Sequence, residues 1–321
     1  MVTVPASEMT GNTSPSKVAV VGTGSVGASW VALLLANGKD VIAVDPAVDA
    51  EERAMAFVNS AWPALQALVA DCTASPDFRH LRFGSIADIA QDASFIIEAA
   101  PERPALKQDL IQSLDAAAAA SVPIATCTGG IRISDLQSGC RNPERIVLLH
   151  PLNPAHLIPS VEIGGSPQTA EWAIEAAEAL CKALGKAPIR IRREAIGHIT
   201  NRLQAALLRE AIHCLVTGIA TAEDIDAAVT EGLGARWATV GPLMTLHLAG
   251  GPNGMAGILA HAGEAMQIWW DDLGTPRLTS DTQSRLIEAA DELANGATPA
   301  QLAAMRDAHL LRLFAAAPNK D

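Results

Sequence analysis

The segment KVAVVGTGSVGASWVALLLANGKDVIAVD, residues 17–45, decides the fold of this chain. It begins with a short β-branched run, continues through a helix-length apolar segment from Ser25 to Asn37, and ends with a second short run that stops at Asp45. Further apolar runs follow at intervals along the next 150 residues or so, and they read SFIIEAA, VPIATCT, RIVLLH and APIRIRR. Short strands that are buried on both faces and alternate with helices predict βαβ units on a mainly parallel sheet.

The loop between the first strand and its helix carries Gly22, Gly24 and Gly27 in the order G-x-G-x-x-G. Glycines in this position permit a tight turn, a close backbone approach to a pyrophosphate and close packing of the helix, whose N-terminus favours negative charge. Because the motif has a strand before it and a helix after it, we expect a dinucleotide to bind here, with Ser25 and Val26 also in the loop. The predicted fold is therefore α/β, of the doubly wound Rossmann type.

Asp45 lies at the end of the second predicted strand. A carboxylate there accepts hydrogen bonds from the adenosine ribose hydroxyls and repels a 2′-phosphate, so it favours NAD over NADP as the cofactor. The alternative is that Asp45 only opens the turn DPA, which removes the cofactor preference but leaves the fold prediction unchanged.

The strand signals end near Arg193, and the rest of the chain has helical periodicity. The segment HITNRLQAALLREAIHCLVTG predicts a helix that stops at Gly218, and Thr221 then begins TAED, a capping-box-like start. We expect a loose tail at residues 1–16, a nucleotide-binding domain at 17–193 and an all-helical domain at 194–321. Within the first domain, Pro63 predicts that the segment after Asp49 forms either two helices or one kinked helix.

Length and composition limit the possible partners. A chain of 321 residues exceeds the roughly 250 residues of most large single domains, which favours two domains. Its 23 Lys and Arg against 35 Asp and Glu give a net charge of −12, which disfavours nucleic acid and anionic membranes and favours a small-molecule substrate. Five cysteines without C-x-x-C spacing suggest no metal site, and the absence of signal-peptide and membrane-span patterns leads us to expect a cytoplasmic protein.

The stretch LLHPLNPAHLIPSVEIGG places His150 at the end of a predicted strand and Glu162 twelve residues later, after a proline-rich turn. Open α/β sheets bind ligands at this edge, and a histidine can take the proton of a hydroxyl group near neutral pH. A carboxylate bonded to one ring nitrogen would fix the tautomer and leave the other nitrogen for the substrate. The alternative, a solvent-facing histidine and a glutamate on an edge strand, is equally compatible with the spacing.

Several motifs together resemble one family. The pieces GTGSVG, EAAPERPALK, HPLNP, VEI, GHITNRL, EDIDAAV and GLGARWATVGP occur in the order found in the 3-hydroxyacyl-CoA dehydrogenase family, and they cover the chain from Lys17 to about Gly251. Within it, AWPAL, HPLNPAHLIPSVEI, RWATVGPLMTLHLAGG and WWDDLG resemble the short branch that contains L-carnitine dehydrogenase and lambda-crystallin (L-gulonate 3-dehydrogenase).

This resemblance implies NAD-dependent oxidation of the 3-hydroxyl of an L-3-hydroxy acid, with His150 as the general base and Glu162 as its partner. It implies that Asn201 bonds the reacting oxygen and that Glu102 and Lys107 contact the cofactor. The helical domain would bind substrate and form a homodimer. Asn201 could instead be a helix cap, and Glu102 and Lys107 could be an ordinary surface pair.

The sequence departs from the family pattern at two positions. Relatives commonly read Thr-Ser after the fifth strand, whereas Thr128 is followed here by Gly129. His198 replaces a common phenylalanine, and a solvent-facing side chain is the favoured interpretation.

The substrate stays open between three classes. A small CoA-free acid with a carnitine-like scaffold ranks first, ahead of a 3-hydroxyacyl-CoA and L-gulonate, and Thr128 and Trp237 are the candidate substrate contacts. A crystallin-like structural role that retains NAD binding is the non-enzymatic alternative.

Overall fold

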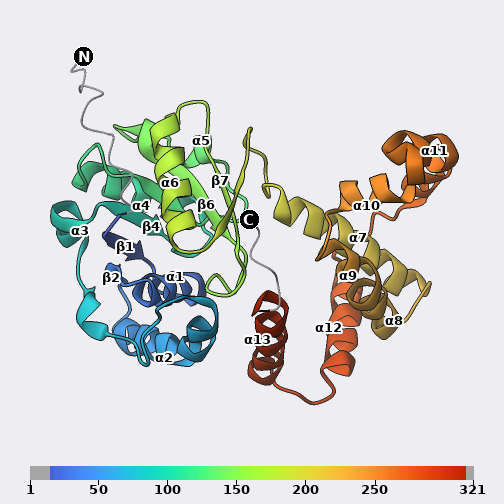
Figure 1. Cartoon of the computed structure of the whole chain (residues 1–321), viewed down its shortest axis with the longest axis horizontal. Helices are drawn as coiled ribbons and strands as arrows, with labels where there is room; N and C mark the ends of the chain where they lie inside the picture. The colour runs from blue at the N-terminus through green and yellow to red at the C-terminus, as the bar shows by residue number, and fades with distance from the viewer. Residues whose placement is uncertain (1–14, 316–321) are drawn as a thin grey trace. The chain divides into compact units, whose positions relative to one another are not determined.

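The computed structural model describes residues 15–315 (Figure 1). Two compact units divide the chain. Among the described residues, the sheet unit comprises 15–202 and 305–315, and the helical unit is Leu203–Ala304. Most of the predicted tail at residues 1–16 lies outside the described residues.

The sheet unit is built on one eight-stranded sheet in the order β3-β2-β1-β4-β5-β6-β7-β8. All neighbouring strands are parallel except β6 and β7, which are antiparallel. The mainly parallel, doubly wound prediction is therefore confirmed. The strands are β1 (Lys17–Val21), β2 (Asp40–Val44), β3 (Leu81–Phe83), β4 (Phe95–Glu98), β5 (Ile124–Thr126), β6 (Ile146–Pro151), β7 (Ser160–Gly164) and β8 (Ala187–Arg190).

Helices cover both faces of this sheet because alternate strand residues point to opposite sides. Val18 and Val20 of β1 pack in the core under α1, α2 and α6, whereas Ala19 and Val21 pack in a second core with α3, α4 and α5. The helices of this unit are α1 (Ser25–Ala36), α2 (Ala50–Leu68), α3 (Ile86–Asp92), α4 (Pro104–Ala117), α5 (Ile133–Leu136) and α6 (Glu171–Ala183), with short 3₁₀ turns η2 (Phe78–His80) and η3 (Pro143–Arg145).

Three local predictions need correction. Pro63 lies inside a single α2, so the two-helix alternative is wrong; Trp62 and Leu65 are buried beside it, and their packing offsets the one backbone hydrogen bond that proline removes. Strand β3 was not predicted because it has only three residues and none is fully buried. The last strand, predicted to reach Arg193, ends at Arg190.

The helical unit contains only helices and turns. The glycine stop after α7 is confirmed, since Gly218 has a φ of +76°, and the Thr221 hydroxyl accepts a hydrogen bond from the N–H of Asp224 at the start of α8. The elements from residue 200 onward are α7 (Thr200–Thr217), α8 (Ala222–Ala227), the π-helix η4 (Ala228–Leu233), α9 (Gly234–Trp237), α10 (Pro242–Ala249), the 3₁₀ turn η5 (Gly251–Asn253), α11 (Gly254–Asp272), α12 (Ser280–Ala294) and α13 (Pro299–Ala315), of which α7 begins and α13 ends in the sheet unit.

Candidate active site

The turn from β1 into α1 needs glycine at two places. Gly22 has a φ of +89°, and a Cβ there would lie 2.8 Å from the Ala99 oxygen and from the Ala100 nitrogen. A Cβ on Gly27 would lie 1.8 Å from the Gly22 oxygen. Both glycines therefore allow the loop to pack directly on α1 and on the chain that follows β4.

Gly24 has a different environment. A Cβ there would meet no atom within 4 Å, and both Gly24 and Ser25 are exposed. Gly24 is the N-cap of α1, whose start has no side-chain cap and no acidic residue in its first turn, where Ser25 and Val26 lie. Open backbone N–H groups at a helix N-terminus, beside an exposed glycine, fit the pyrophosphate of a dinucleotide.

Asp45 connects the end of β2 to this loop. Its Oδ2 accepts hydrogen bonds from the Thr23 N–H at 2.7 Å and the Thr23 hydroxyl at 3.0 Å, and its Oδ1 accepts one from the Ala47 N–H at 3.0 Å. Burial raises the pKa of this carboxyl, but the hydrogen bonds from Ala47 and Thr23 outweigh it and hold the pKa below its ordinary value. Asp45 thus opens the turn and also presents a carboxylate at the glycine loop.

His150 and Glu162 face each other across the antiparallel pair. They are direct partners in the register of β6 and β7, and His150 Nδ1 lies 2.7 Å from Glu162 Oε2. Glu162 is fully buried and His150 is only 8% exposed. The alternative, a solvent-facing histidine and a glutamate on an edge strand, is therefore wrong, since β7 also pairs with a strand on each side.

The second oxygen of Glu162 binds the start of α7. Oε1 accepts hydrogen bonds from the Ile199 N–H at 2.8 Å and the Thr200 N–H at 2.9 Å. Burial raises the pKa of Glu162, but the hydrogen bonds from His150, Thr200 and Ile199 outweigh burial and lower it below the ordinary value. One charged carboxylate thus fixes both the imidazole and the first turn of α7.

The turn at residues 128–130 lies beside this pair. The Glu102 carboxylate holds it, because Oε1 accepts hydrogen bonds from the Thr128 hydroxyl at 2.6 Å and from the N–H groups of Gly129 and Gly130 at 3.1 Å each. The Thr128 hydroxyl also accepts from the Ile131 N–H at 3.0 Å, and Thr128 is fully buried. The hydroxyl predicted as a substrate contact is therefore engaged within the chain.

Asn201 reaches the same turn from α7. Its Nδ2 donates a hydrogen bond to the Gly129 oxygen at 2.8 Å. A Cβ on Gly129 would lie 3.3 Å from this Nδ2 and 3.6 Å from His150 Nε2. The structure thus brings His150, Asn201 and Gly129 around one small space, into which the second nitrogen of the imidazole points.

Lys107 has a partner, Glu98, that we did not predict from the sequence. Its Nζ donates to both Glu98 oxygens, at 2.9 and 3.0 Å, and lies farther, 3.8 Å, from Glu102 Oε2. Both Lys107 and Glu98 are buried, so the surface-pair alternative is wrong for the lysine. A glutamate that ends the otherwise apolar strand FIIE was the available signal, since a charge in such a strand needs a buried partner. Glu98 also accepts from the Thr126 hydroxyl at 2.6 Å.

The structure also corrects the prediction for His198, which is 2% exposed rather than solvent-facing. Its Nε2 lies 3.1 Å from the Thr128 oxygen, and its ring centroid lies 5.3 Å from that of His150. A carbonyl can only accept, so Nε2 carries the proton, while the buried Nδ1 has no partner among the described residues. Burial, together with the charge of His150, lowers the pKa of His198 below its ordinary value, against the hydrogen bond to Thr128.

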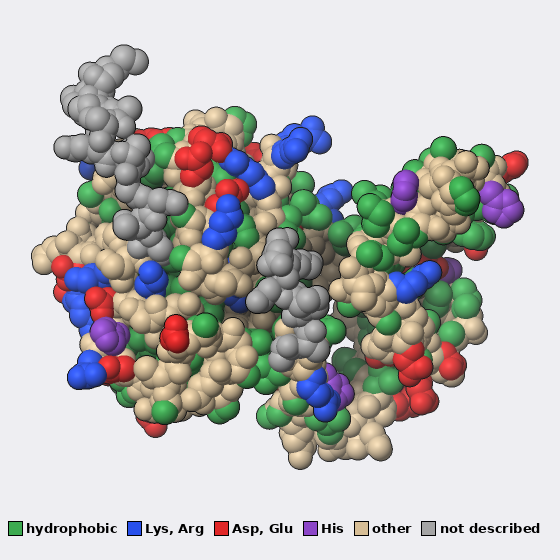
Figure 2. Space-filling model, in the orientation of Figure 1, with side chains coloured by type: hydrophobic (Ala, Val, Ile, Leu, Met, Phe, Trp, Pro, Cys, Tyr) green, Lys and Arg blue, Asp and Glu red, His purple; other side chains and the backbone are tan. Residues whose placement is uncertain are grey.

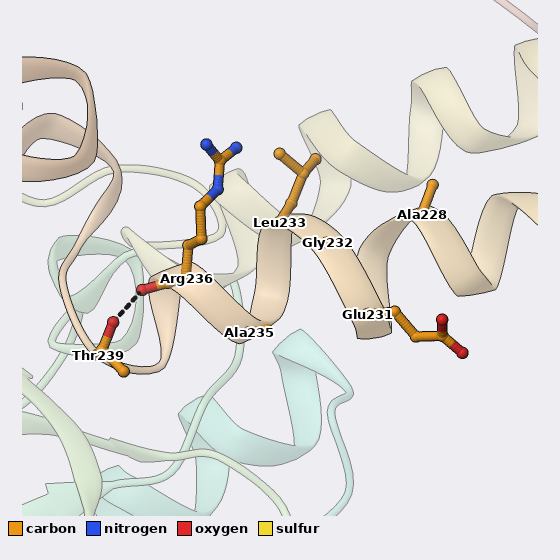
Figure 3. Close-up of a pocket in the computed structure, with 7 residues that line it drawn as sticks. All are labelled: Ala228, Glu231, Gly232, Leu233, Ala235, Arg236 and Thr239. Carbon is orange, nitrogen blue, oxygen red and sulfur yellow. Dashed lines mark hydrogen bonds between the residues drawn. The ribbon is translucent and has the colours of Figure 1, made fainter. Parts of the chain in front are cut away.

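Trp237 belongs to the helical unit, at the end of α9, and is 37% exposed. A surface hollow of about 530 Å³ lies beside the π-helix η4 (Figure 3), and Trp237 is not among the residues that line it. The hollow is lined by Ala228, Glu231, Gly232, Leu233, Ala235, Arg236 and Thr239.

Residues 15–315 contain no group of three or more His, Cys, Asp or Glu side chains placed to hold a metal ion. Within the same range, no helix is long and apolar enough to cross a membrane.

Comparisons with known proteins identify the family. Residues 17–195 match the family model of the 3-hydroxyacyl-CoA dehydrogenase NAD-binding domain, and residues 197–302 match that of the C-terminal domain. The chain is 43% identical to L-carnitine dehydrogenase of Nocardiopsis dassonvillei over 92% of this chain and 89% of that protein. It is 42% identical to L-carnitine dehydrogenase of Streptomyces coelicolor over 96% of each chain.

Solved structures of two dehydrogenases are similar to this chain over most of its length. A 5-formyl-3-hydroxy-2-methylpyridine 4-carboxylic acid 5-dehydrogenase, described as an NAD+-dependent dismutase, matches with a TM-score of 0.78 and 27% identity over 94% of this chain and 96% of that chain. An (S)-3-hydroxybutyryl-CoA dehydrogenase from Ralstonia eutropha matches with a TM-score of 0.63 and 29% identity over 77% and 85%. With two family domains that together span residues 17–302, the chain belongs to the 3-hydroxyacyl-CoA dehydrogenase family and is an NAD-dependent oxidoreductase that oxidises a hydroxyl group.

Proposed function

We propose that this enzyme oxidises the 3-hydroxyl of a small L-3-hydroxy acid to the 3-oxo acid, with L-carnitine as the leading substrate. The observation that carries the proposal is the buried His150–Glu162 pair, whose free imidazole nitrogen points at the space between Gly129 and Asn201. The named relatives with 42–43% identity, both L-carnitine dehydrogenases, support the choice of acid.

The proposed reaction needs a base, an orienting group and a donor. His150 Nε2 takes the proton of the substrate hydroxyl as the carbinol hydrogen leaves with its electron pair. Glu162 holds Nδ1 protonated and stabilises the imidazolium that forms. Asn201 Nδ2, already 2.8 Å from the Gly129 oxygen, has a second hydrogen for the reacting oxygen.

Bound NAD would supply the hydride acceptor for this step. We propose that its pyrophosphate binds at the loop of Gly22, Gly24, Ser25, Val26 and Gly27, because the first turn of α1 has no side-chain cap and Gly24 is open. Gly22 and Gly27 would contribute by letting this loop pack closely. Asp45 would accept hydrogen bonds from the adenosine ribose.

Glu102, which precedes α4, and Lys107, on α4, are the proposed cofactor contacts beside the turn at residues 128–130. Glu102 orders three donors of the 128–130 turn, and Lys107 is held by Glu98. Trp237 stays a proposed substrate contact because exposed indole rings bind quaternary ammonium groups.

The test is the initial rate of NADH formation with L-carnitine, L-gulonate, L-3-hydroxybutyrate and L-3-hydroxybutyryl-CoA, for the wild type and for His150→Ala. We expect the highest kcat/KM with L-carnitine, and loss of turnover with retained NADH affinity in the variant. A higher kcat/KM with the CoA ester or with L-gulonate would overturn the substrate assignment. Full activity of His150→Ala would overturn the assignment of the base.

We also propose that the helical unit forms a homodimer. Its α10 and α11 leave large apolar side chains exposed, including Leu243, Ile268, Trp269 and Trp270, at 62% to 75% of their area. Figure 2 shows hydrophobic side chains on the surface of this unit. An apolar surface of this kind is stable in water when a second copy covers it. A monomer on gel filtration would contradict this homodimer.

We also propose a cytoplasmic location, because all five cysteines are free. Secretion of the protein would contradict this location.

A further inference from the structure

The two peptide units on either side of Gly129 are each held at both ends. In the first unit, the Gly129 N–H donates to Glu102 Oε1 at 3.1 Å. The carbonyl oxygen of this unit belongs to Thr128 and accepts from His198 Nε2 at 3.1 Å. In the second unit, the N–H donates to the same Glu102 oxygen at 3.1 Å, and the carbonyl oxygen accepts from Asn201 Nδ2 at 2.8 Å. Glu102 thus holds both units, while His198 and Asn201 hold one carbonyl each.

A glycine between two peptide units makes these contacts necessary. Gly129 has no Cβ to restrict its φ and ψ, so the two units can turn relative to each other more easily than at any other residue. The Thr128 side chain is bonded to Glu102, but the first peptide unit can rotate without moving that side chain. Among the described residues, His198 is the only polar partner of the Thr128 oxygen. Without His198, the first unit would be free to rotate and would displace the second.

His198 is held in place for this single contact. Its ring is 2% exposed and binds the Thr128 oxygen through Nε2, while Nδ1 has no partner in the described part of the chain. Its φ of +51° lies in the left-handed region, which costs free energy for any residue with a side chain and persists where surrounding contacts hold it.

The segment at residues 198–201 connects the 128–130 turn to the base. Its two inner residues, Ile199 and Thr200, donate their N–H groups to Glu162, the partner of His150. Its two outer residues bind the two successive carbonyls of the turn. The same four residues therefore fix the turn and the carboxylate that orients the imidazole.

We propose that His198 is a positioning residue of the oxidation, which fixes the Thr128 carbonyl and thereby keeps the next carbonyl where Asn201 binds it. The Asn201 amide is then oriented with its second hydrogen toward the reacting oxygen. The proposal rests on the proposed function, in which Asn201 donates to that oxygen. His198 acts through Asn201 and contacts no reacting atom.

The experiment is a double-mutant cycle on kcat/KM, measured at saturating NAD with whichever of the four acids the wild type oxidises best. The variants are His198→Phe, which keeps a ring and removes the donor, Asn201→Ala, and the two combined. His198→Gln is the rescue variant, because its amide N–H can replace that of the imidazole. His156→Phe is the matched control, since it removes a buried histidine of the same unit whose partner is Ser29.

We expect His198→Phe to lower kcat/KM by about 10- to 100-fold, because a misplacement of about 1 Å in a site costs about 100-fold. In the Asn201→Ala background the same change should cost less than about threefold, because residues of one network do not act additively. His198→Gln and His156→Phe should stay within about threefold of the wild type, and NADH affinity should be retained in every variant.

Three results would overturn the role of His198. They are wild-type activity of His198→Phe, an equal loss in both backgrounds, which a general effect on packing would give, and a His198→Gln protein as slow as His198→Phe. If His198→Phe does not bind NADH, His198→Leu, which also lacks a donor, takes its place.

Failure of the proposed function has a different signature. Full activity of Asn201→Ala would overturn the donor to the reacting oxygen, and the role of His198 with it. Full activity of His150→Ala would overturn the base. If both of these variants lose activity and the losses of His198→Phe and Asn201→Ala are additive, the proposed function stands and the role of His198 alone is overturned.

Discussion

The two units of this protein differ in the kinds and number of side chains that they bury. The sheet unit has two apolar cores and, between and beside them, buried charged groups that include Glu98, Lys107, Arg145 and Glu162. Across residues 203–304, all of which the structure describes, only Ile212, Gly254, Gly274 and Thr282 are buried. The helical unit thus buries almost no large apolar side chain, although its composition includes many.

The difference shows what each unit needs in order to be stable. A buried charge is tolerated only when its hydrogen bonds are complete, and the sheet unit supplies them at Glu98, Arg145 and Glu162. Exposed apolar helices lack the burial that offsets the entropy cost of folding. We therefore expect the sheet unit to respond most strongly to loss of a polar partner, and the helical unit to loss of its association with a second copy.

The largest effect is expected for Glu162→Gln, which removes the charge that joins His150 to α7. Without it the imidazolium loses its partner, and kcat should fall about 10³-fold while NADH affinity is retained.

Glu171→Gln is the matched control, since Glu171 is exposed at the start of α6. It should keep wild-type kcat. If Glu162→Gln lowered kcat by less than about tenfold, the buried pair of His150 and Glu162 would have a structural role and not a catalytic one.

Lys107→Met should lower the free energy of unfolding of the sheet unit by about 3 kcal/mol, because it leaves the fully buried Glu98 carboxylate without its cation. Urea denaturation followed by circular dichroism measures this change. The double variant Lys107→Met, Glu98→Gln should regain most of the lost stability.

The exposed pair Arg132–Asp135, whose side chains are 50% and 53% exposed, gives the contrast. Arg132→Ala should cost no more than about 0.5 kcal/mol. If Lys107→Met and Arg132→Ala lowered the free energy of unfolding equally, this would contradict the view that buried charges determine the stability of the sheet unit.

The helical unit is tested by Trp269→Asp together with Trp270→Asp. If a second copy covers α11, the two charges should raise the dimer dissociation constant by about 100-fold, since buried aromatic anchors dominate interfaces. Sedimentation velocity at several concentrations measures the constant. The control is Leu106→Asp, at a 41% exposed residue on α4 of the sheet unit, which should leave the dimer dissociation constant unchanged. A monomeric wild type would show that the helical unit is stable without this cover.

The sequence predicted those parts of the fold that repeat a strong local pattern. Strands β1 and β2 and helix α1 agree with the expected segments because apolar runs and the glycine turn mark both ends. Strand β3 lacks such a pattern, with three residues and no fully buried side chain, and Pro63 is accommodated by the tertiary packing of α2.

In the candidate site, the proximity of His150 and Glu162 could be expected because a turn between antiparallel strands brings them opposite each other. Glu98 and His198 could not be placed in the same way. Their partners, Lys107 and Thr128, come from separate elements, and no spacing along the chain relates them.

The smallest expected effect is on the pH dependence of the free energy of unfolding, and it arises from a buried histidine of the sheet unit. His156 is buried beside Ser29 of α1, with Nδ1 2.6 Å from the hydroxyl, and burial lowers its pKa to about 4. The unfolded chain has the ordinary value near 6.5, so it binds a proton more readily than the folded protein below that pH. Stability from this group is therefore complete above pH 6.5 and falls as the pH drops toward 4, by about 2 kcal/mol between pH 7 and pH 5.

His156→Gln keeps a hydrogen-bonding side chain but cannot titrate, and this isolates the histidine from the other groups that titrate in the same range. The free energy of unfolding of the variant should lose about 2 kcal/mol less than that of the wild type between pH 7 and pH 5. Urea denaturation at both pH values gives the difference, and the packing cost of the substitution cancels because it is present at each. Parallel losses in the two proteins would mean that His156 takes up its proton without leaving the core, and that buried groups of the sheet unit adapt more freely than its complete hydrogen bonding suggests.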